Sequence, residues 1–196
     1  SLPQASIQSL QNRGATFILC NNALTIFAGL VAKKDGLDPV AVYEDLTVRG
    51  GGEFMASVQG LSRPQRKLRI DELIEAYDFA DRQQQLAGTM SGGQKQRLGL
   101  ACAIVHTPEL LFLHEPTSAV DPESRRNFWA SLFELADAGT TLLVSTHYMD
   151  EAERCHRLAI LESGRLVADG TPEALCAALP GKVWLLRSAK TRAAEA

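Results

Sequence analysis

The residues best suited to chemistry stand where apolar stretches begin or end, and the first group is a short glycine-containing turn. Ser91, Gly92, Gly93 and Gln94 precede an apolar, helix-compatible stretch that starts at Leu98. Serine is a good helix N-cap, and the first turn of a helix presents unbonded N–H groups and a partial positive charge. Because glycines let a ligand approach the backbone, this turn predicts a phosphate-binding site. The alternative is an ordinary turn, which the same residue types also form.

Two polar residues stand just beyond short apolar runs further along the chain. Glu115 follows the run 110–113, and His147 follows the run 141–144. Runs of this length indicate buried strands. A helix is predicted between them from Pro122, because proline suits the first turn of a helix. Two buried strands connected by a helix predict a right-handed crossover and a parallel sheet.

The order of these motifs resembles the C-terminal part of the nucleotide-binding domain of ATP-binding cassette (ABC) transporters, from about residue 43 to 175. Four motifs are matched in order, and they are the signature motif at 91–94, the Walker B strand at 110–115, the D-loop at 118–121 and the switch histidine at His147. The segment 145–155 looks most like drug-export and ABC-2-type ATPases. The resemblance implies an α/β fold with a P-loop-NTPase-like (RecA-like) parallel sheet and a small helical subdomain.

The resemblance also implies roles for single residues. In the family, ATP on the P-loop of one domain is closed over by the signature motif of a second domain, so Ser91 and Gly93 would touch the γ-phosphate. Glu115 would act as general base or orient the attacking water, a role that suits a carboxylate. His147 would contact the γ-phosphate and sense hydrolysis, and Asp121 would bridge the two halves. The structural alternatives are a capping or salt-bridged carboxylate at Glu115 and an ordinary strand-end histidine at His147.

Two departures from the family concern the chain's own nucleotide site. The P-loop pattern G-x-x-x-x-G-K-[ST], whose N–H groups, lysine and hydroxyl hold the phosphates and Mg²⁺, does not occur in the 196 residues. The segment 17–30 resembles the strand and helix around that loop with the centre missing. His114 stands at the position of the Walker B aspartate, although Mg²⁺ prefers oxygen ligands. We therefore expect a missing or degenerate Walker A and assign no metal ligand, and we leave binding of ATP and Mg²⁺ by this chain alone, and its own ATPase activity, open.

The chain is expected to divide into four segments, with its N-terminal part truncated relative to the family. They are a degenerate remnant of the Walker A region at 1–42, a helical subdomain at 43–90, an α/β core at 91–187 and a loose tail at 188–196. Smaller elements are also expected, namely a strand at 16–20, a buried helix at 23–32, a hairpin at 158–168 and a final strand at 182–186.

The helical subdomain contains three consecutive glycines at 50–52. Each glycine disfavours a helix interior by about 1 kcal/mol, so the first helix is predicted to begin near Glu53. A flexible hinge at the glycines is the alternative. A second helix at 64–79 is predicted from apolar residues at helical spacing. These residues are Ile70, Leu73, Ile74 and Tyr77.

Composition and charge narrow the functional classes. A net charge of −3 gives no indication of a nucleic-acid-binding protein, and a hydrophobic fraction of 45% is ordinary for a globular chain. No segment approaches the roughly 20 apolar residues that a membrane-spanning helix needs, so membrane association is expected through a partner. The four cysteines lack metal-ligand spacing and are expected to be reduced cytosolic thiols.

By resemblance, the chain is an ATP-binding subunit of an export transporter that couples ATP binding and hydrolysis to transport through a membrane permease, with its own nucleotide site impaired. Its expected partners are that transmembrane permease and a second ABC nucleotide-binding domain, on the cytoplasmic face of the cell membrane. The alternative is a non-hydrolysing subunit that lends 91–94 to a competent partner, or an inert product of gene decay. A third hypothesis is an ABC protein acting on ribosomes. That class typically carries two cassettes joined by a charged linker, and the 196 residues show neither a second cassette nor such a linker, so this hypothesis is disfavoured.

Overall fold

The computed structural model describes residues 15–18, 38–118 and 120–179. The described residues form two compact units, which divide between Thr146 and His147. The helix expected at 23–32, the strand expected at 182–186 and the expected tail lie outside the described residues. The four-segment division of the chain stays a prediction.

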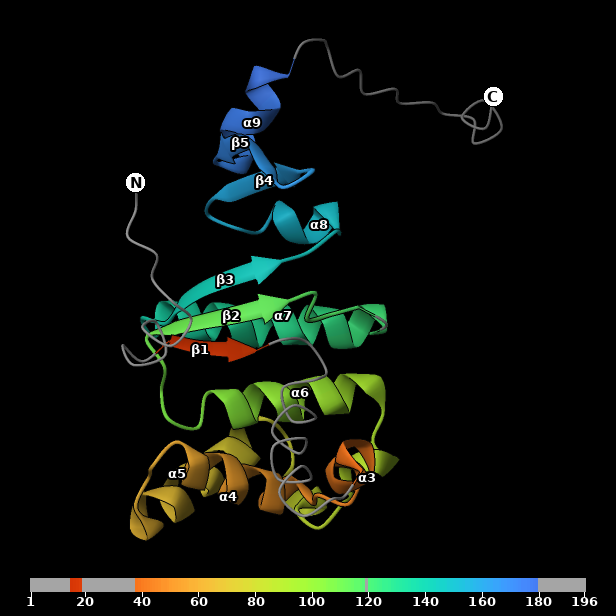
Figure 1. The fold of residues 1–196 in the computed structure, drawn as a ribbon, viewed down its shortest axis with the longest axis vertical. Coiled ribbons are helices and arrows are strands. Elements are labelled where there is room, and N and C mark those ends of the chain that lie inside the picture. Colours follow the sequence, from red (N-terminus) through yellow and green to blue (C-terminus); the bar gives the residue numbers. More distant parts are fainter. Residues whose placement is uncertain (1–14, 19–37, 119, 180–196) are drawn as a thin grey trace, which may run out of the picture. The chain divides into compact units, whose positions relative to one another are not determined.

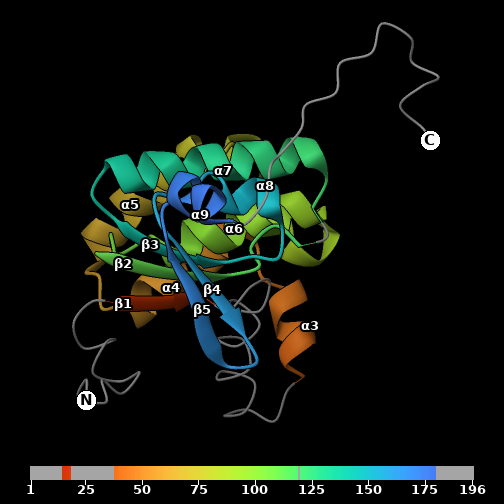
Figure 2. The same cartoon turned by 90° about the horizontal axis from the view of Figure 1, so that it is seen from above.

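The first unit contains a parallel three-stranded sheet in the order β1 (Ala15–Ile18), β2 (Leu110–His114) and β3 (Thr141–Ser145). The helix α7 (Pro122–Asp137) connects β2 to β3 and lies along one face of the sheet, as Figures 1 and 2 show. The parallel sheet predicted from the two apolar runs is confirmed. Buried side chains of β2 and α7 form the core of this layer, and they are Leu111, Leu113, Phe128 and Leu132.

The helix α6 (Gly92–Ala103) is buried over most of its circumference from Leu98 onward. Leu98, Leu100 and Ala101 are all less than a tenth exposed. A helix that is apolar on several faces belongs in the interior of a domain. Its first turn is therefore the polar end of a helix whose remaining turns are packed in the core.

A group of helices between β1 and α6 comprises α3 (Pro39–Glu44), α4 (Val48–Val58), α5 (Arg63–Ala76) and two short 3₁₀ turns, η2 (Ala80–Arg82) and η3 (Ala87–Thr89). The core-facing stripe predicted for the second helix is confirmed, because Ile70, Leu73, Ile74 and Tyr77 are all buried. The helix α5 ends at Ala76, three residues before the predicted end.

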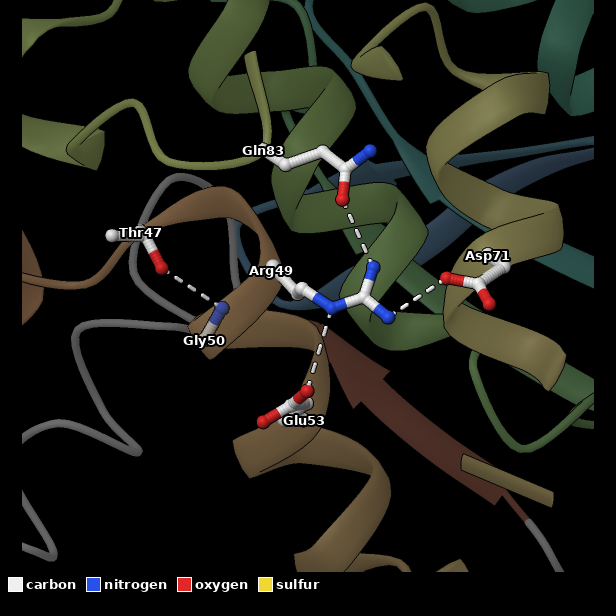
Figure 3. A network of polar contacts seen from close by, with 6 residues as sticks. All are labelled: Thr47, Arg49, Gly50, Glu53, Asp71 and Gln83. Atoms are coloured by element: carbon white, nitrogen blue, oxygen red, sulfur yellow. Dashed lines mark hydrogen bonds and ion pairs between the residues drawn. The ribbon is translucent and has the colours of Figure 1, made fainter. Parts of the chain in front are cut away.

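The prediction that the first helix of this group begins near Glu53 is wrong, because α4 begins at Val48 and includes all three glycines. Thr47 is the N-cap, and its side chain accepts a hydrogen bond from the N–H of Gly50 at 3.0 Å. Arg49 donates to Gln83 Oε1 at 3.0 Å and to Asp71 Oδ1 at 2.8 Å. Figure 3 shows this arginine reaching across to both partners, which hold the first turn in place. These contacts offset the low helix propensity of glycine.

The second unit contains α8 (Met149–Ala152), the antiparallel hairpin of β4 (Leu158–Glu162) and β5 (Arg165–Gly170), and α9 (Pro172–Ala178). The predicted hairpin is thus present, and its turn contains Ser163 and Gly164 at positive φ. The Thr171 side chain caps α9 by accepting from Ala174 N–H at 3.2 Å. Among the helices that the structure describes in either unit, none is long and apolar enough to cross a bilayer.

Candidate functional site

The signature turn, residues 91–94, is held by a reciprocal pair of hydrogen bonds. Ser91 Oγ accepts from the N–H of Gln94 at 3.3 Å, and Gln94 Oε1 accepts from the N–H of Ser91 at 2.9 Å. This capping box leaves the hydroxyl proton of Ser91 available for donation. The N–H groups of Gly92 and Gly93 are the first two of a 12-residue helix, where intrahelical partners are lacking. The turn therefore offers donors and a positive dipole end to an anion.

Asp121 lies against the signature turn. It is the N-cap of α7, and its Oδ1 accepts from the N–H groups of Glu123 at 3.1 Å and Ser124 at 2.9 Å. The backbone N–H of Ser124, the Ser124 hydroxyl and the N–H of Glu123 lower the pKa of this carboxyl. An ideal Cβ placed on Gly93 would lie 3.8 Å from Asp121 Oδ2. The structure thus brings two of the sequence-predicted motifs, the signature motif and the D-loop, to one place.

Glu115 follows β2 at a position of backbone strain. Its φ is +44°, in the left-handed region that residues other than glycine, asparagine and aspartate rarely adopt. Its N–H donates to the carbonyl of Ser145 at 2.7 Å, which extends the β2–β3 pairing by one bond. Strained backbone of this kind costs on the order of 1–3 kcal/mol and concentrates at functional sites. The geometry is consistent with the catalytic role expected of Glu115, and that role stays a prediction.

His114, at the Walker B aspartate position, is paired with Ser145 across the sheet. Its Nδ1 lies 2.6 Å from the Ser145 hydroxyl oxygen. Mg²⁺ takes hard oxygen ligands in octahedral geometry, and an imidazole does not supply them. Among the residues that the structure describes, no group of three or more histidine, cysteine, aspartate or glutamate side chains could hold a metal ion. The described residues therefore offer donors to an anion at the signature turn, but His114 does not supply an oxygen ligand for Mg²⁺. Contact between the signature turn and ATP stays a prediction.

His147 is the first residue of the second unit. Its ring centroid lies 4.2 Å from that of Tyr148, at an interplanar angle of 34°. The contact with a γ-phosphate that the resemblance implies for His147 stays a prediction.

Sequence reasoning did not single out Ser124, although its side chain touches both the signature turn and Asp121. The local signal was an aspartate three residues earlier, followed by Pro122, which marks Asp121 as an N-cap with Ser124 at the third helical position. The sequence contained no signal for the contact between Ser124 and Gly93, because this contact depends on how two helices that start 30 residues apart pack together.

Comparison with known proteins assigns the chain to a family. The family model described as ABC transporter matches residues 11–118. The chain is 40% identical over 168 residues to the probable multidrug ABC transporter ATP-binding protein YbhF of Escherichia coli K12, an overlap of 86% of this chain and 28% of that protein. It is 41% identical over 148 residues to the daunorubicin/doxorubicin resistance ATP-binding protein DrrA of Streptomyces peucetius, covering 75% of this chain and 45% of that one. The chain belongs to the ABC transporter family and contains part of its ATP-binding domain.

Solved structures agree with this assignment. An ATP-binding subunit of an ABC transporter matches with a TM-score of 0.59 and 30% identity over 68% of this chain and 56% of its own. CbiO1 of Clostridium perfringens, part of the ABC transporter complex cbiONQ, matches with a TM-score of 0.61 and 25% identity over 68% and 54%. The expected P-loop-NTPase-like α/β fold is confirmed. The chain spans less than half the length of the curated relatives named above.

Proposed function

We propose that this chain is the ATP-binding subunit of an ABC-type export transporter, coupling ATP binding and hydrolysis to transport through a membrane permease, with its own nucleotide site impaired. The observation that carries the proposal is the signature turn. It combines a capping serine, whose hydroxyl can still donate, with two glycine N–H groups at the positive end of a buried helix. This is the arrangement that closes over the phosphates of ATP bound to a second domain.

The names of the relatives support export as the direction of transport. They are a multidrug transporter, a daunorubicin/doxorubicin resistance protein and, at 40% identity over 148 residues, the Nod factor export ATP-binding protein I of Burkholderia thailandensis. In this proposal the chain works with a transmembrane permease and a second ABC nucleotide-binding domain. It lies on the cytoplasmic face of the cell membrane, held there by the permease.

Impairment of the chain's own site is supported by two features. The 196 residues contain no P-loop pattern, and the Walker B aspartate position is His114, paired with a serine hydroxyl. Both features weaken the hold on Mg²⁺ and the β- and γ-phosphates, where much of the stabilisation of phosphoryl transfer lies.

A second candidate function follows from the contrast between these two regions. The signature turn is fully formed, whereas the Walker B position is altered. The chain would then be a non-hydrolysing subunit that lends residues 91–94 to a partner with an intact P-loop. Both versions make the signature turn the working part of the chain, and they differ in whether the chain binds nucleotide itself.

Titration calorimetry of Mg·ATP into the folded 196-residue chain separates the two versions. A lending subunit gives no heat of binding at any nucleotide concentration, whereas an impaired site gives heat only above the micromolar range. A micromolar Kd would show a functional phosphate site in this chain and would contradict the impaired-site proposal.

The signature role is tested with two matched serine substitutions. Ser91→Ala removes the cap of α6. Ser62→Ala removes the N-cap serine of α5, whose hydroxyl donates to Gln65 Oε1 at 2.6 Å. The first change removes a helix cap and the second removes an exposed side-chain hydrogen bond at the same helix position; each costs about 1 kcal/mol, so the two variants have similar structural costs. The activity measured is ATP hydrolysis by the chain reconstituted with a permease and an ABC subunit that carries G-x-x-x-x-G-K-[ST].

We expect Ser91→Ala to lower hydrolysis by roughly tenfold to a hundredfold, the effect of losing a hydrogen bond to a charged group. Ser62→Ala is expected to leave hydrolysis near the wild-type rate. Equal effects of both variants would refute a direct role of the signature turn. A folded chain that neither binds Mg·ATP nor changes the partner's hydrolysis would be an inert product.

A further inference from the structure

The signature turn and the D-loop aspartate are joined through one side chain, that of Ser124 in the first turn of α7. An ideal Cβ on Gly93 would lie 2.6 Å from Ser124 Oγ and 2.8 Å from Ser124 Cβ. Carbon atoms do not approach that closely, so Ser124 fills the space that a side chain at position 93 would need. Rotation of the serine hydroxyl does not make room, because its Cβ is fixed by the helix backbone. The first turns of α6 and α7 are therefore in direct steric contact.

The same serine holds Asp121. Its backbone N–H donates to Asp121 Oδ1 at 2.9 Å. Its hydroxyl donates to the same carboxylate, and both bonds lower the pKa of that group. The Ser124 side chain thus touches Gly93 on one side and the Asp121 carboxylate on the other.

We propose that Ser124 is a positioning residue that couples the signature turn to Asp121. A displacement of the first turn of α6 pushes on the Ser124 side chain, because the contact has no free space. The displaced serine changes the hydrogen bonds that orient the carboxylate, and movement of Asp121 acts on the signature turn by the same route. The functional meaning of this coupling rests on the proposed function, in which one group faces ATP and the other faces the second domain.

The coupling is measurable in the isolated chain, without ATP or a partner. The readout is the carboxyl pKa of Asp121, followed by NMR through its ¹³C chemical shift during a pH titration. Ser124→Ala removes the hydroxyl donor, so the pKa of Asp121 rises. Gly93→Ala leaves both donor groups in the chain, but its methyl meets the Ser124 hydroxyl and Cβ, so it is expected to raise the same pKa by displacing Ser124.

Two further variants make the test specific. Gly99→Ala is the matched control, because Gly99 lies in the same helix and its added Cβ meets nothing within 4 Å. We expect it to leave the Asp121 titration unchanged. Ser124→Gly empties the space beside position 93, so Gly93→Ala in that background is expected to add no further shift to the Asp121 titration.

The proposal is overturned if Gly93→Ala moves the pKa of Asp121 no more than Gly99→Ala does. It is also overturned if the shift caused by Gly93→Ala persists at full size in the Ser124→Gly background, since the coupling would then bypass the serine side chain. If Gly93→Ala alone fails to fold, Ser124→Ala and the Gly93→Ala/Ser124→Gly double variant still decide the matter. Folding of the double variant together with unfolding of Gly93→Ala would itself locate the conflict at Ser124. An outcome in either direction is independent of whether the chain binds ATP.

Discussion

The start of α4 at Val48, despite three consecutive glycines, gives a sharp prediction for two substitutions in one helix. Gly52→Ala places a methyl group 3.5 and 3.6 Å from two side-chain carbons of Ile70, which is ordinary van der Waals contact. Replacing glycine by alanine in a helix interior contributes about 1 kcal/mol. A methyl that is half-buried against Ile70 adds roughly 0.4 kcal/mol, half the value for a fully buried group. We therefore expect Gly52→Ala to raise the unfolding free energy by about 1–1.5 kcal/mol.

Gly50→Ala is the matched control, with the same chemical change two residues earlier. Its Cβ would lie 2.9 Å from Thr47 Oγ1, the atom that accepts the hydrogen bond from Gly50 N–H. Disturbing this cap costs about 1 kcal/mol, which cancels the gain in helix propensity. The restriction of the unfolded chain is the same in both variants, so it drops out of their difference. We expect Gly50→Ala to be neutral or destabilising.

Urea unfolding of the 196-residue chain, followed by far-UV circular dichroism, measures both changes. For a chain of this size, 1 kcal/mol corresponds to about 2–4 °C in Tm, so thermal melts provide an independent check. Equal stabilisation by both variants would refute the claim that the Thr47 side chain caps α4 and that Gly50→Ala disturbs this cap. Destabilisation by Gly52→Ala would refute the claim that a methyl group at position 52 fits beside Ile70 without a clash. No effect from either would place the helix start at Glu53, as the sequence pattern alone predicts.

Three further predictions concern single residues. Thr107 is β-branched and has a φ of +52°, so Thr107→Asn, which tolerates the left-handed region without loosening the unfolded chain as glycine does, is expected to raise the unfolding free energy by up to about 1 kcal/mol in urea titrations. The pKa of Asp121 lies below its ordinary 3.8, so its contribution to stability is present above that value and lost as pH falls through the lower folded-state pKa. Asp121→Asn keeps a capping oxygen, so it should flatten the loss of stability below about pH 4 in unfolding curves recorded across the acid range. Burial raises the pKa of the Cys102 thiol to about 12, so iodoacetamide at pH 8 should modify the exposed Cys176 and reach Cys102 only after unfolding, as peptide mass spectrometry would show.

The sequence by itself determined those features that depend on neighbours along the chain. The strand of β2, the helix that begins at Pro122 and the strand of β3 follow from two apolar runs and a proline. The capping box of Ser91 and Gln94 spans three residues, so its geometry is local as well. Their order was enough to predict the parallel sheet and the ABC resemblance, which the solved structures and the family model confirm. The roles of the site residues in ATP chemistry stay predictions.

Tertiary structure alone decided the features that depend on residues far apart in the sequence. Helix α4 begins at Val48 because Arg49 reaches Asp71 and Gln83, 22 and 34 positions away, and propensity counted along the chain does not include such contacts. The need for glycine at position 93 likewise comes from Ser124, which only the packing of α6 against α7 brings into contact. Local interactions act over one turn and are visible in the pattern of residue types. Steric fit between helices depends on where whole elements come to rest, and so it emerges only in the folded chain.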